Sequence, residues 1–202
     1  MTPQSARPAR RRLDAEQRRD AILEAARRLY ATAPYPEVSV AQVAEAAGAS
    51  AALVFHYFDS KAGLYAALVS SDLAQLAAAQ AEANEALPQG TPARDRVRTA
   101  LEAHLDQVAD PQRWSASRTG GEEPAEAQQV RRDARAEEVE RLRELLHVSD
   151  WARHEYALWG CFGFLDAACL HWAARGCPAD ERNPLIEAAL GSLEGALGDW
   201  GG

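Results

Sequence analysis

The feature that most constrains this chain is the helical spacing of its apolar residues, which recur every three or four positions along nearly the whole sequence. No stretch alternates apolar and polar residues in the manner of a half-buried strand. Proline and glycine interrupt the pattern, notably at Pro34 and Gly48 and within residues 88–92. The spacing therefore predicts an all-α fold, with helices over about residues 15–33, 40–47, 51–57, 61–86, 92–109, 124–147, 151–175 and 183–200.

Charge is distributed unevenly along the chain. The net charge of the 202 residues is −8, which excludes a uniformly basic nucleic-acid-binding surface. Residues 1–65 nevertheless carry a formal charge of +2, so the remainder carries −10. This asymmetry predicts that the N-terminal part meets a polyanion and that the acidic body does not.

The cysteines and histidines do not form a recognisable metal or redox motif. Three cysteines in a chain of this length are not a disulfide framework, and they suit a reducing cytoplasm. The candidates for a metal site near the C-terminus are Cys161, Cys169, His171 and Cys177. On one helix, residues 169 and 171 point about 200° apart, so the spacing predicts structural cysteines. The sequence contains neither a Gly-rich phosphate loop nor a nucleophile elbow, and it predicts no cofactor and no catalytic activity.

One apolar stretch is nearly long enough to span a membrane. Asp166 is its only charged residue within 156–174. An aspartate near the centre of a span costs roughly 2.5–3.5 kcal/mol, which favours a helix buried in a soluble bundle. The charged residues Asp14 and Glu16 lie just after Leu13, where a signal peptide would have an apolar core, so we expect a cytoplasmic protein.

Two short helices around Gly48 form the most specific motif. Ser39 and Gln42 have the spacing of a capping box, and Val38 and Val43 that of a hydrophobic staple. Gly48 suits the left-handed residue that ends this helix, and Ser50 suits the N-cap of the next. Two short helices joined by a glycine-containing turn are typical of a helix-turn-helix, whose second helix enters the major groove of DNA.

The run from Ser39 to Ser50, continued by 53–61 and Leu64, resembles the DNA-binding domain of the tetracycline-repressor (TetR) family of bacterial regulators. The resemblance covers about residues 15–66. It implies a flexible basic arm at 1–13, a helix-turn-helix domain at 14–60 and a ligand-binding and dimerisation domain at 61–202. Members of the family are homodimers that bind palindromic operators, usually repress, and release DNA when a small molecule binds the body.

The resemblance also implies roles for single residues. Phosphate contacts are expected from Ser39, Tyr57 and Lys61, since hydroxyls and a cation suit phosphate oxygens. The base-facing positions are Ser50, Ala51, Ala52, Phe55 and His56. Phe55 stands where the family often has Tyr, and Gly63 replaces the usual acidic or polar residue. The resulting face is unusually apolar and predicts contacts to thymine methyl groups. For Arg7–Arg12, a DNA-binding arm and a solubilising tail both remain open.

The body offers candidates for an effector pocket and for a dimer interface. Pocket-lining candidates are Trp114, Tyr156, Trp159 and Phe162, with Asp166 to orient a ligand; core packing and local pairing are the alternatives. The stripe of Ile186, Leu190, Leu193 and Leu197, together with Gly160 and Gly163, predicts a four-helix dimer interface built from the last two helices. Other functions compatible with an all-α chain are a small-molecule-binding protein with a degenerate helix-turn-helix and an α-helical enzyme.

Overall fold

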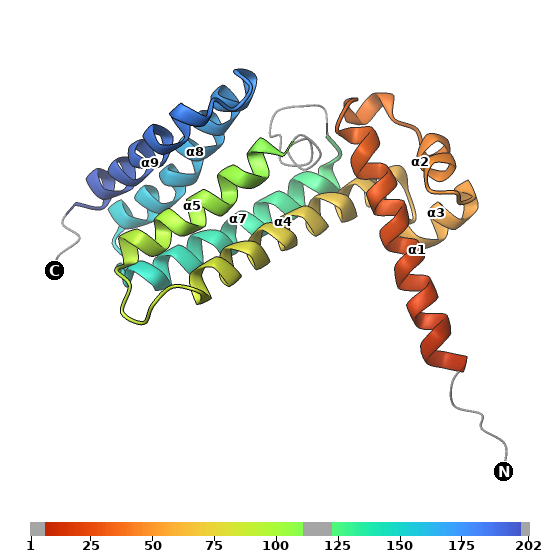
Figure 1. Ribbon diagram of the computed structural model, residues 1–202, viewed down its shortest axis with the longest axis horizontal. Coiled ribbons are helices and arrows are strands. Elements are labelled where there is room, and N and C mark those ends of the chain that lie inside the picture. Colours follow the sequence, from red (N-terminus) through yellow and green to blue (C-terminus); the bar gives the residue numbers. More distant parts are fainter. Residues whose placement is uncertain (1–6, 111–122, 199–202) are drawn as a thin grey trace, which may run out of the picture.

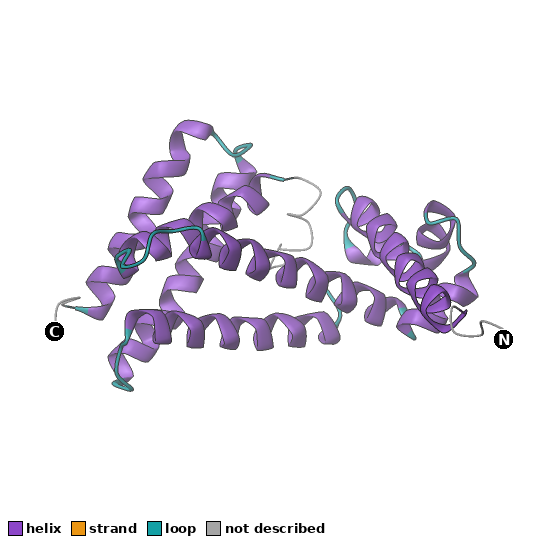
Figure 2. Ribbon diagram, turned by 60° about the horizontal axis from the view of Figure 1, so that its bottom comes forward, coloured by secondary structure: helices purple, strands orange, loops and turns teal. Residues whose placement is uncertain are grey.

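The computed structural model describes residues 7–110 and 123–198, and every element within those ranges is a helix (Figures 1 and 2). The N-terminal part comprises α1 (Arg7–Tyr30), a short 3-10 helix η1 (Tyr35–Glu37), α2 (Val40–Ala46) and α3 (Ala51–Phe58). The body comprises α4 (Lys61–Glu85), α5 (Ala93–Ala109), α7 (Ala125–Leu146), α8 (Ala152–Ala174), the short η2 (Ala179–Glu181) and α9 (Arg182–Leu197). The predicted all-α architecture is confirmed.

Helix α1 is longer than the sequence pattern indicated. It begins at Arg7 rather than near residue 15. Pro8 is compatible with this start, because an N–H in the first turn of a helix has no acceptor within the helix and proline lacks only that group. Asp14 therefore lies within the helix.

The helix-turn-helix follows the local sequence signals closely. The Ser39 hydroxyl accepts from the Gln42 N–H at 3.2 Å, and the Ser39 N–H donates to Oε1 of Gln42 at 2.7 Å, which completes the predicted capping box. Val38 and Val43 are both buried, as a hydrophobic staple requires. Gly48 has φ of +62°, so the left-handed turn between α2 and α3 falls on a glycine, as predicted.

The junction between α3 and α4 explains an unusual residue. The Ser60 hydroxyl caps α4 by accepting from the Gly63 N–H at 2.9 Å. A Cβ at position 63 would overlap the carbonyl oxygen of Phe58, so the tight entry into α4 requires glycine there. The departure from the family pattern at Gly63 is therefore a consequence of close packing against the end of α3.

Helices α5 and α8 begin without a side-chain hydrogen bond to their first turn. Pro92 is the N-cap of α5, and the Thr91 hydroxyl donates to the Pro88 carbonyl at 2.7 Å instead of capping the helix. Trp151 is the N-cap of α8, and the neighbouring Asp150 lies 3.9 Å from Arg143. In both cases a nearby polar group offers the side chain an alternative to the helix N-terminus.

The buried apolar residues form two clusters. The first packs α1, α2 and α3 around residues such as Ile22, Val43 and Val54, and it includes Leu64 and Leu68 from the first turns of α4. The second fills the body between α5, α7, α8 and α9. Figure 1 shows α4 running from the N-terminal helices to the far end of the body, so this helix connects the two parts of the molecule.

The apolar stripe of α9 belongs to the core of a single subunit. Ile186, Leu190, Leu193 and Leu197 are each at most 6% exposed and pack in the second cluster. The prediction that this stripe forms the dimer interface is therefore wrong, because α8 and α5 already cover it. The exposed faces of α8 and α9 instead carry small residues at Gly160, Gly163, Gly191 and Gly195.

Within residues 7–110 and 123–198, two helices are long and apolar enough to cross a membrane by length and composition alone, namely α4 and α8. Both pack against other helices: α4 lies along α5 and α7, and α8 lies along α9. Each is therefore accounted for as a bundle helix with one buried face.

Candidate nucleic-acid interface and effector cavity

Helix α3 presents one face to solvent and anchors the other. Val54 and Phe58 are buried in the first cluster, whereas Ala52, Phe55 and His56 are exposed. Residues 52, 55 and 56 share a face because they are three and four positions apart on a helix. Phe55 is 46% exposed, which is unusual for a large apolar side chain. The structure thus holds a predominantly apolar ridge on a rigid helix.

Two of the other residues predicted for DNA contact are partly engaged in packing. Ala51 and Tyr57 are half-buried and pack against the first cluster. Ser50 is exposed, and its hydroxyl accepts from the Leu53 N–H at 3.2 Å as the N-cap of α3. These three residues flank the exposed face and help to fix its position on the domain.

Lys61 and Ser39 are also tied to their surroundings. The Lys61 ammonium donates to the Pro36 carbonyl at 3.2 Å and lies 4.3 Å from the centroid of the Tyr35 ring. Partial burial lowers the pKa of Lys61. The Ser39 hydroxyl donates to Oε1 of Gln42 at 2.8 Å. Both residues therefore support local structure next to α3.

A buried ion pair joins α1 to α4, and the sequence analysis missed it. Nε and Nη2 of Arg27 donate to Oδ1 of Asp72 at 3.0 and 2.5 Å, with both side chains at most 10% exposed. From α5, the Gln107 amide donates to the Asp72 carbonyl at 3.5 Å. An acidic residue on the buried face of an apolar helix was the available signal, because such a charge is rarely buried without a partner.

The body encloses a cavity of about 270 Å³ between α4, α5, α7 and α8. Its apolar lining includes Leu76, Leu101, Leu142 and Leu165. Phe162 and Asp166, two of the predicted ligand-binding residues, line this cavity. Trp114 lies outside the described residues.

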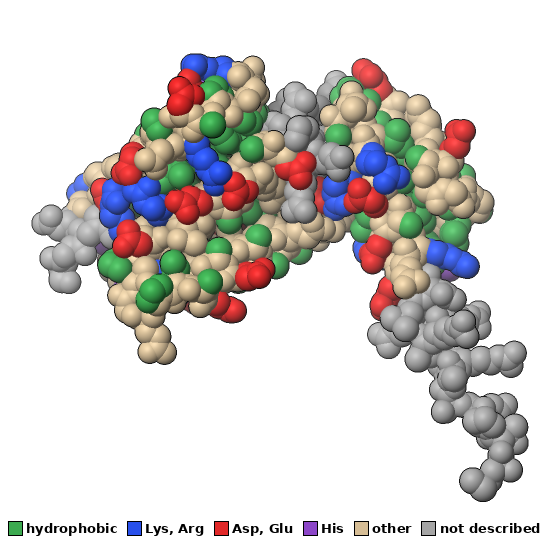
Figure 3. Space-filling model, viewed as in Figure 1, with side chains coloured by type: hydrophobic (Ala, Val, Ile, Leu, Met, Phe, Trp, Pro, Cys, Tyr) green, Lys and Arg blue, Asp and Glu red, His purple; other side chains and the backbone are tan. Residues whose placement is uncertain are grey.

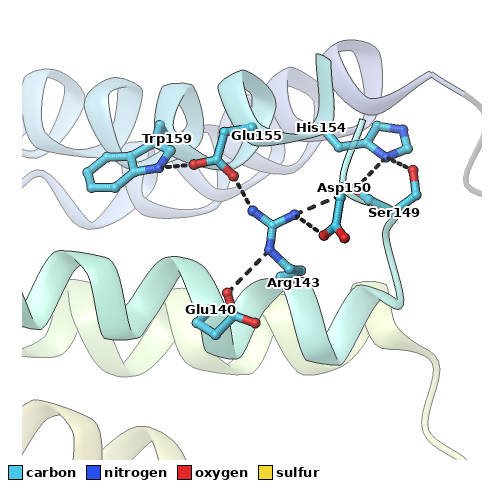
Figure 4. Close-up of polar contacts among 7 residues, drawn as sticks. All are labelled: Glu140, Arg143, Ser149, Asp150, His154, Glu155 and Trp159. Atoms are coloured by element: carbon cyan, nitrogen blue, oxygen red, sulfur yellow. Dashed lines mark hydrogen bonds and ion pairs between the residues drawn. The ribbon is translucent and has the colours of Figure 1, made fainter. Parts of the chain in front are cut away.

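Tyr156 and Trp159 do not line the cavity, which corrects their predicted role. They are 77% and 43% exposed because they lie on the outer face of α8. The Trp159 indole N–H donates to Oε1 of Glu155 at 2.7 Å, and Glu155 pairs with Arg143 (Figure 4). Figure 4 shows the same guanidinium between Glu140 and Asp150, so this network fixes the turn from α7 to α8 and holds the indole outside.

Polar side chains gather on one wall of the cavity. Nη2 of Arg135 donates to both oxygens of Asp166, at 2.9 and 3.1 Å, so this aspartate is paired across α7 and α8. Nε of Arg135 also lies 3.6 Å from the Glu138 carboxylate. Burial raises the pKa of Glu138, and Arg135 opposes that shift. Burial lowers the pKa of His104 to about 4, so this imidazole is neutral at physiological pH.

The cysteines are poorly suited to metal binding. Burial raises the pKa of Cys161 to about 11 and that of Cys169 to about 12. A metal requires the thiolate, which these environments disfavour. Among the described residues, no group of three or more Cys, His, Asp or Glu side chains is arranged to hold a metal ion.

The comparisons with known proteins agree with this geometry. Residues 22–68 match the family model described as bacterial regulatory proteins, tetR family. An HTH-type transcriptional repressor, AcnR of Corynebacterium diphtheriae, is 40% identical over 65 residues, which cover 32% of this chain and 34% of that protein. The match thus spans about a third of the length of this relative.

Solved structures share the fold of the whole body. A putative TetR-family regulator from Rhodococcus sp. has a TM-score of 0.73 at 19% identity, over 90% of this chain and 100% of that one. FadR from Bacillus subtilis, solved in complex with stearoyl-CoA, has a TM-score of 0.69 at 17% identity, over 88% and 96%. Fold and motif together define a helix-turn-helix protein with a helical body. Residues 22–68 are similar to the N-terminal helix-turn-helix domain of the tetR family of bacterial regulatory proteins.

Proposed function

We propose that this protein is a transcriptional repressor that binds a palindromic operator as a homodimer and leaves it when a small molecule enters the body. The observation that carries the proposal is the exposed face of α3 within a segment that matches the tetR-family model. All eight residues expected to contact DNA fall within residues 22–68. A repressor, AcnR, is the relative that shares 40% identity over 65 residues.

In this proposal the DNA-binding domain is residues 14–60 and the body is residues 61–202. Ala52, Phe55 and His56 face the bases of one major groove, with Ser50 and Ala51 at the entering end of α3. Ser39, Tyr57 and Lys61 contact phosphates on either side, which sets register rather than sequence preference. Lys61 can do so while bonded to Pro36, because an ammonium has further N–H donors.

The dimer interface in this proposal is the exposed face of α8 and α9. A Cβ built at Gly160, Gly163, Gly191 or Gly195 would meet nothing within 4 Å in the subunit. Small residues on adjoining helices allow two copies to approach closely, and the exposed Tyr156 and Trp159 supply apolar area at the same face. Figure 1 shows α8 and α9 side by side at the end of the body opposite the DNA-binding helices.

The effector site in this proposal is the cavity between α4, α5, α7 and α8. A structural neighbour, FadR of Bacillus subtilis, is solved in complex with stearoyl-CoA, which supports small-molecule binding in a body of this fold.

In this proposal the protein acts in the cytoplasm, where a bacterial transcriptional regulator meets its DNA. The body surface is unsuited to DNA, because its cations are largely paired: Arg94 with Glu194 at 2.7 Å and Arg135 with Asp166 are examples. Figure 3 shows acidic and basic side chains interspersed over the face it draws.

Selection from a random duplex library, followed by gel shift, tests the proposal. We expect a palindromic consensus and a complex with two chains per duplex. His56→Asp places a carboxylate on the groove-facing side of α3 and should abolish binding. Ala136→Asp adds the same charge at an exposed site on α7 and should leave binding intact. A library that yields no enriched sequence would instead favour a small-molecule-binding protein with a degenerate helix-turn-helix.

A further inference from the structure

The cavity between α4, α5, α7 and α8 also indicates which kind of molecule it takes. We infer that it binds an uncharged, elongated apolar molecule with one hydroxyl group, and that the ring of His104 is the hydrogen-bonding partner of this hydroxyl. The inference rests on the proposed function, in which the cavity is the effector site. It adds the chemical class of the effector and its orientation in the cavity.

The lining of the cavity is long and largely apolar. On α4 it extends from Leu73 to Asn84, a distance of roughly 16 Å at about 1.5 Å per residue. Each of the four helices contributes a leucine to it, namely Leu76, Leu101, Leu142 and Leu165. A cavity of about 270 Å³ with such a lining suits a narrow apolar body better than a compact polar molecule.

Two of the three arginines in the lining are already bound by carboxylates. Nε of Arg131 donates to both oxygens of Glu123, at 3.2 and 3.1 Å, and these side chains are 13% and 10% exposed. Nη2 of Arg135 donates to both oxygens of Asp166, at 2.9 and 3.1 Å. An anionic ligand that drew either arginine away would therefore leave a carboxylate without its partner inside the protein.

The third arginine and the remaining carboxylate of the lining are neighbours on α7. Arg135 and Arg141 stand three positions before and after Glu138, and both oppose the rise in its pKa that burial causes. Nε of Arg135 lies 3.6 Å from this carboxylate. Glu137, a further partner of Arg141 at 4.0 Å, is 74% exposed, so water screens its charge. Every charged group of the lining thus has an opposite charge beside it, and a charged ligand of either sign would find no free partner.

His104 contributes an uncharged polar group to the same lining. Burial lowers its pKa to about 4, so the ring is neutral at physiological pH. The amide groups of Gln80 and Asn84 also line the cavity, but they donate to the carbonyls of Ala100 and Gln80, each at 3.1 Å. The Oδ1 atom of Asn84 has no partner among the described residues, but it is fully buried. No hydrogen bond joins the His104 ring to another described residue, so this ring is available to a ligand.

A hydroxyl group suits this ring in either of its tautomers. One nitrogen of a neutral imidazole is a donor and the other is an acceptor, and a hydroxyl can accept from the first or donate to the second. A carbonyl or an ether can only accept, so it matches one of the two arrangements. A hydrogen bond from the ligand would also relieve the cost of keeping a polar ring without a partner in the protein interior.

The position of His104 along α5 sets the orientation of the ligand. The hydrogen bond from Gln80 to Ala100 aligns α4 with α5, and the two helices run in opposite directions from the connection at 86–92 (Figure 1). His104 lies one turn beyond Ala100, away from that connection, and thus toward the DNA-binding helices. The hydroxyl is therefore bound at this end of the cavity, and the apolar body extends toward the connection.

Equilibrium dialysis of the full chain without DNA, at neutral pH and with four matched probes, tests the inference. 4-Butylbenzyl alcohol, 1-butyl-4-ethylbenzene, 4-butylbenzylamine and 4-butylphenylacetate share one apolar body and end in a hydroxyl, a methyl, a cation and an anion. We expect the alcohol to bind roughly tenfold or more tightly than the amine and the acid, because each charged probe loses hydration without gaining a free partner.

The comparison of the alcohol with the hydrocarbon isolates the hydrogen bond to His104. His104→Phe keeps an aromatic ring but removes both nitrogens, so it should weaken binding of the alcohol roughly fivefold and leave binding of the hydrocarbon unchanged. The unchanged hydrocarbon affinity also reports that the cavity is intact. His104→Gln keeps a donor and an acceptor and should retain most of the affinity for the alcohol. His171→Phe makes the same change at an exposed position of α8 and should behave as the wild type.

Three results would overturn the inference. They are tightest binding of the amine or the acid by the wild type, an equal effect of His104→Phe on the alcohol and the hydrocarbon, and no binding of any of the four probes. Release of operator DNA is measured separately by gel shift. An alcohol that binds through His104 but leaves the DNA complex intact supports the inference and counts against ligand-induced release in the proposed function.

Discussion

At the scale of single residues, the exposed face of α3 is short of hydrogen-bonding groups. In the proposed complex with DNA, Ala52 and Phe55 face the base edges without a donor or acceptor, and His56 is the polar group beside them. An apolar side chain in the major groove distinguishes bases through the thymine 5-methyl group. The specificity of this protein should therefore depend on methyl contacts to an extent unusual for a helix-turn-helix.

Replacing single thymines by deoxyuridine in the selected operator tests these contacts. The substitution removes one methyl and leaves every base-pair hydrogen bond in place. Each methyl buried against Phe55 or Ala52 should contribute about 0.8 kcal/mol, or about a fourfold change in affinity. Gel shift with Phe55→Ala provides the control, since this variant should no longer distinguish thymine from uracil at the contacted position. Equal affinities in the wild type would exclude methyl recognition.

Lys61 should act on all sequences alike. In the proposed dimer, Lys61→Ala in both subunits would remove two phosphate contacts, so the slope of log K against log salt should fall by roughly 2, at ~0.9 per phosphate. Because Lys61 also bonds to Pro36 and lies over Tyr35, the melting temperature of the variant must be measured in parallel. His56→Ala should instead change which base pairs are preferred. The assignment of roles would be reversed if Lys61→Ala altered base preference and left the slope unchanged.

At the scale of whole elements, α8 and α9 have two faces with different chemistry. The inner face carries Leu193, which is 1% exposed, and the outer face carries Gly163, at which an added side chain meets nothing. The inner face holds the subunit together and the outer face is available to a second copy. Substitutions on the two faces should thus separate folding from dimerisation.

Leu193→Glu should unfold the subunit, because it buries a carboxylate and removes a core leucine, at a cost of several kcal/mol. Gly163→Glu should preserve the helical signal in circular dichroism while shifting the sedimentation coefficient from dimer to monomer. A dimeric Gly163→Glu protein would show that the interface lies elsewhere. A folded monomeric Leu193→Glu protein would restore the stripe of α9 as the interface.

The sequence predicted what local signals determine and missed what packing determines. The capping box of α2, the turn at Gly48 and the existence of the helices depend on neighbouring residues, so their pattern is visible in the chain. The cavity wall depends on which faces of α5, α7 and α8 meet. Tyr156 and Phe162 are both aromatic residues of one apolar helix, yet only Phe162 lines the cavity.

At the scale of the whole molecule, α4 couples the two parts of the chain. Asp72 on this helix binds Arg27 of α1, and the next residue, Leu73, lines the cavity. The buried ion pair to α1 and the cavity wall therefore share adjacent positions of one helix. The pair should be energetically coupled, and both residues should matter to the stability of the whole chain.

A double-mutant cycle measures this coupling. Arg27→Met and Asp72→Leu each leave one buried charge without its main partner, so each should lower the free energy of unfolding by roughly 3–5 kcal/mol. The double variant removes both charges and should recover a large part of that loss. Urea unfolding of the four proteins gives the coupling energy directly. Strictly additive losses would mean that the two side chains do not act as a pair.

His104 should make the stability of the whole molecule depend on pH. Burial lowers its pKa from the ordinary 6.5 to about 4, so between these values the unfolded chain binds a proton that the folded chain excludes. The contribution is present in full above pH 6.5 and is lost as pH falls toward 4, by up to ~3 kcal/mol. The raised pKa of Glu138 acts in the opposite direction, so the comparison must be made between variants. Chemical unfolding of His104→Gln should show a flatter profile over this range than the wild type, whereas His171→Gln, at an exposed position of α8, should match the wild type. If His104→Gln lost stability on acidification as steeply as the wild type, the neutral imidazole would not be part of the cavity wall.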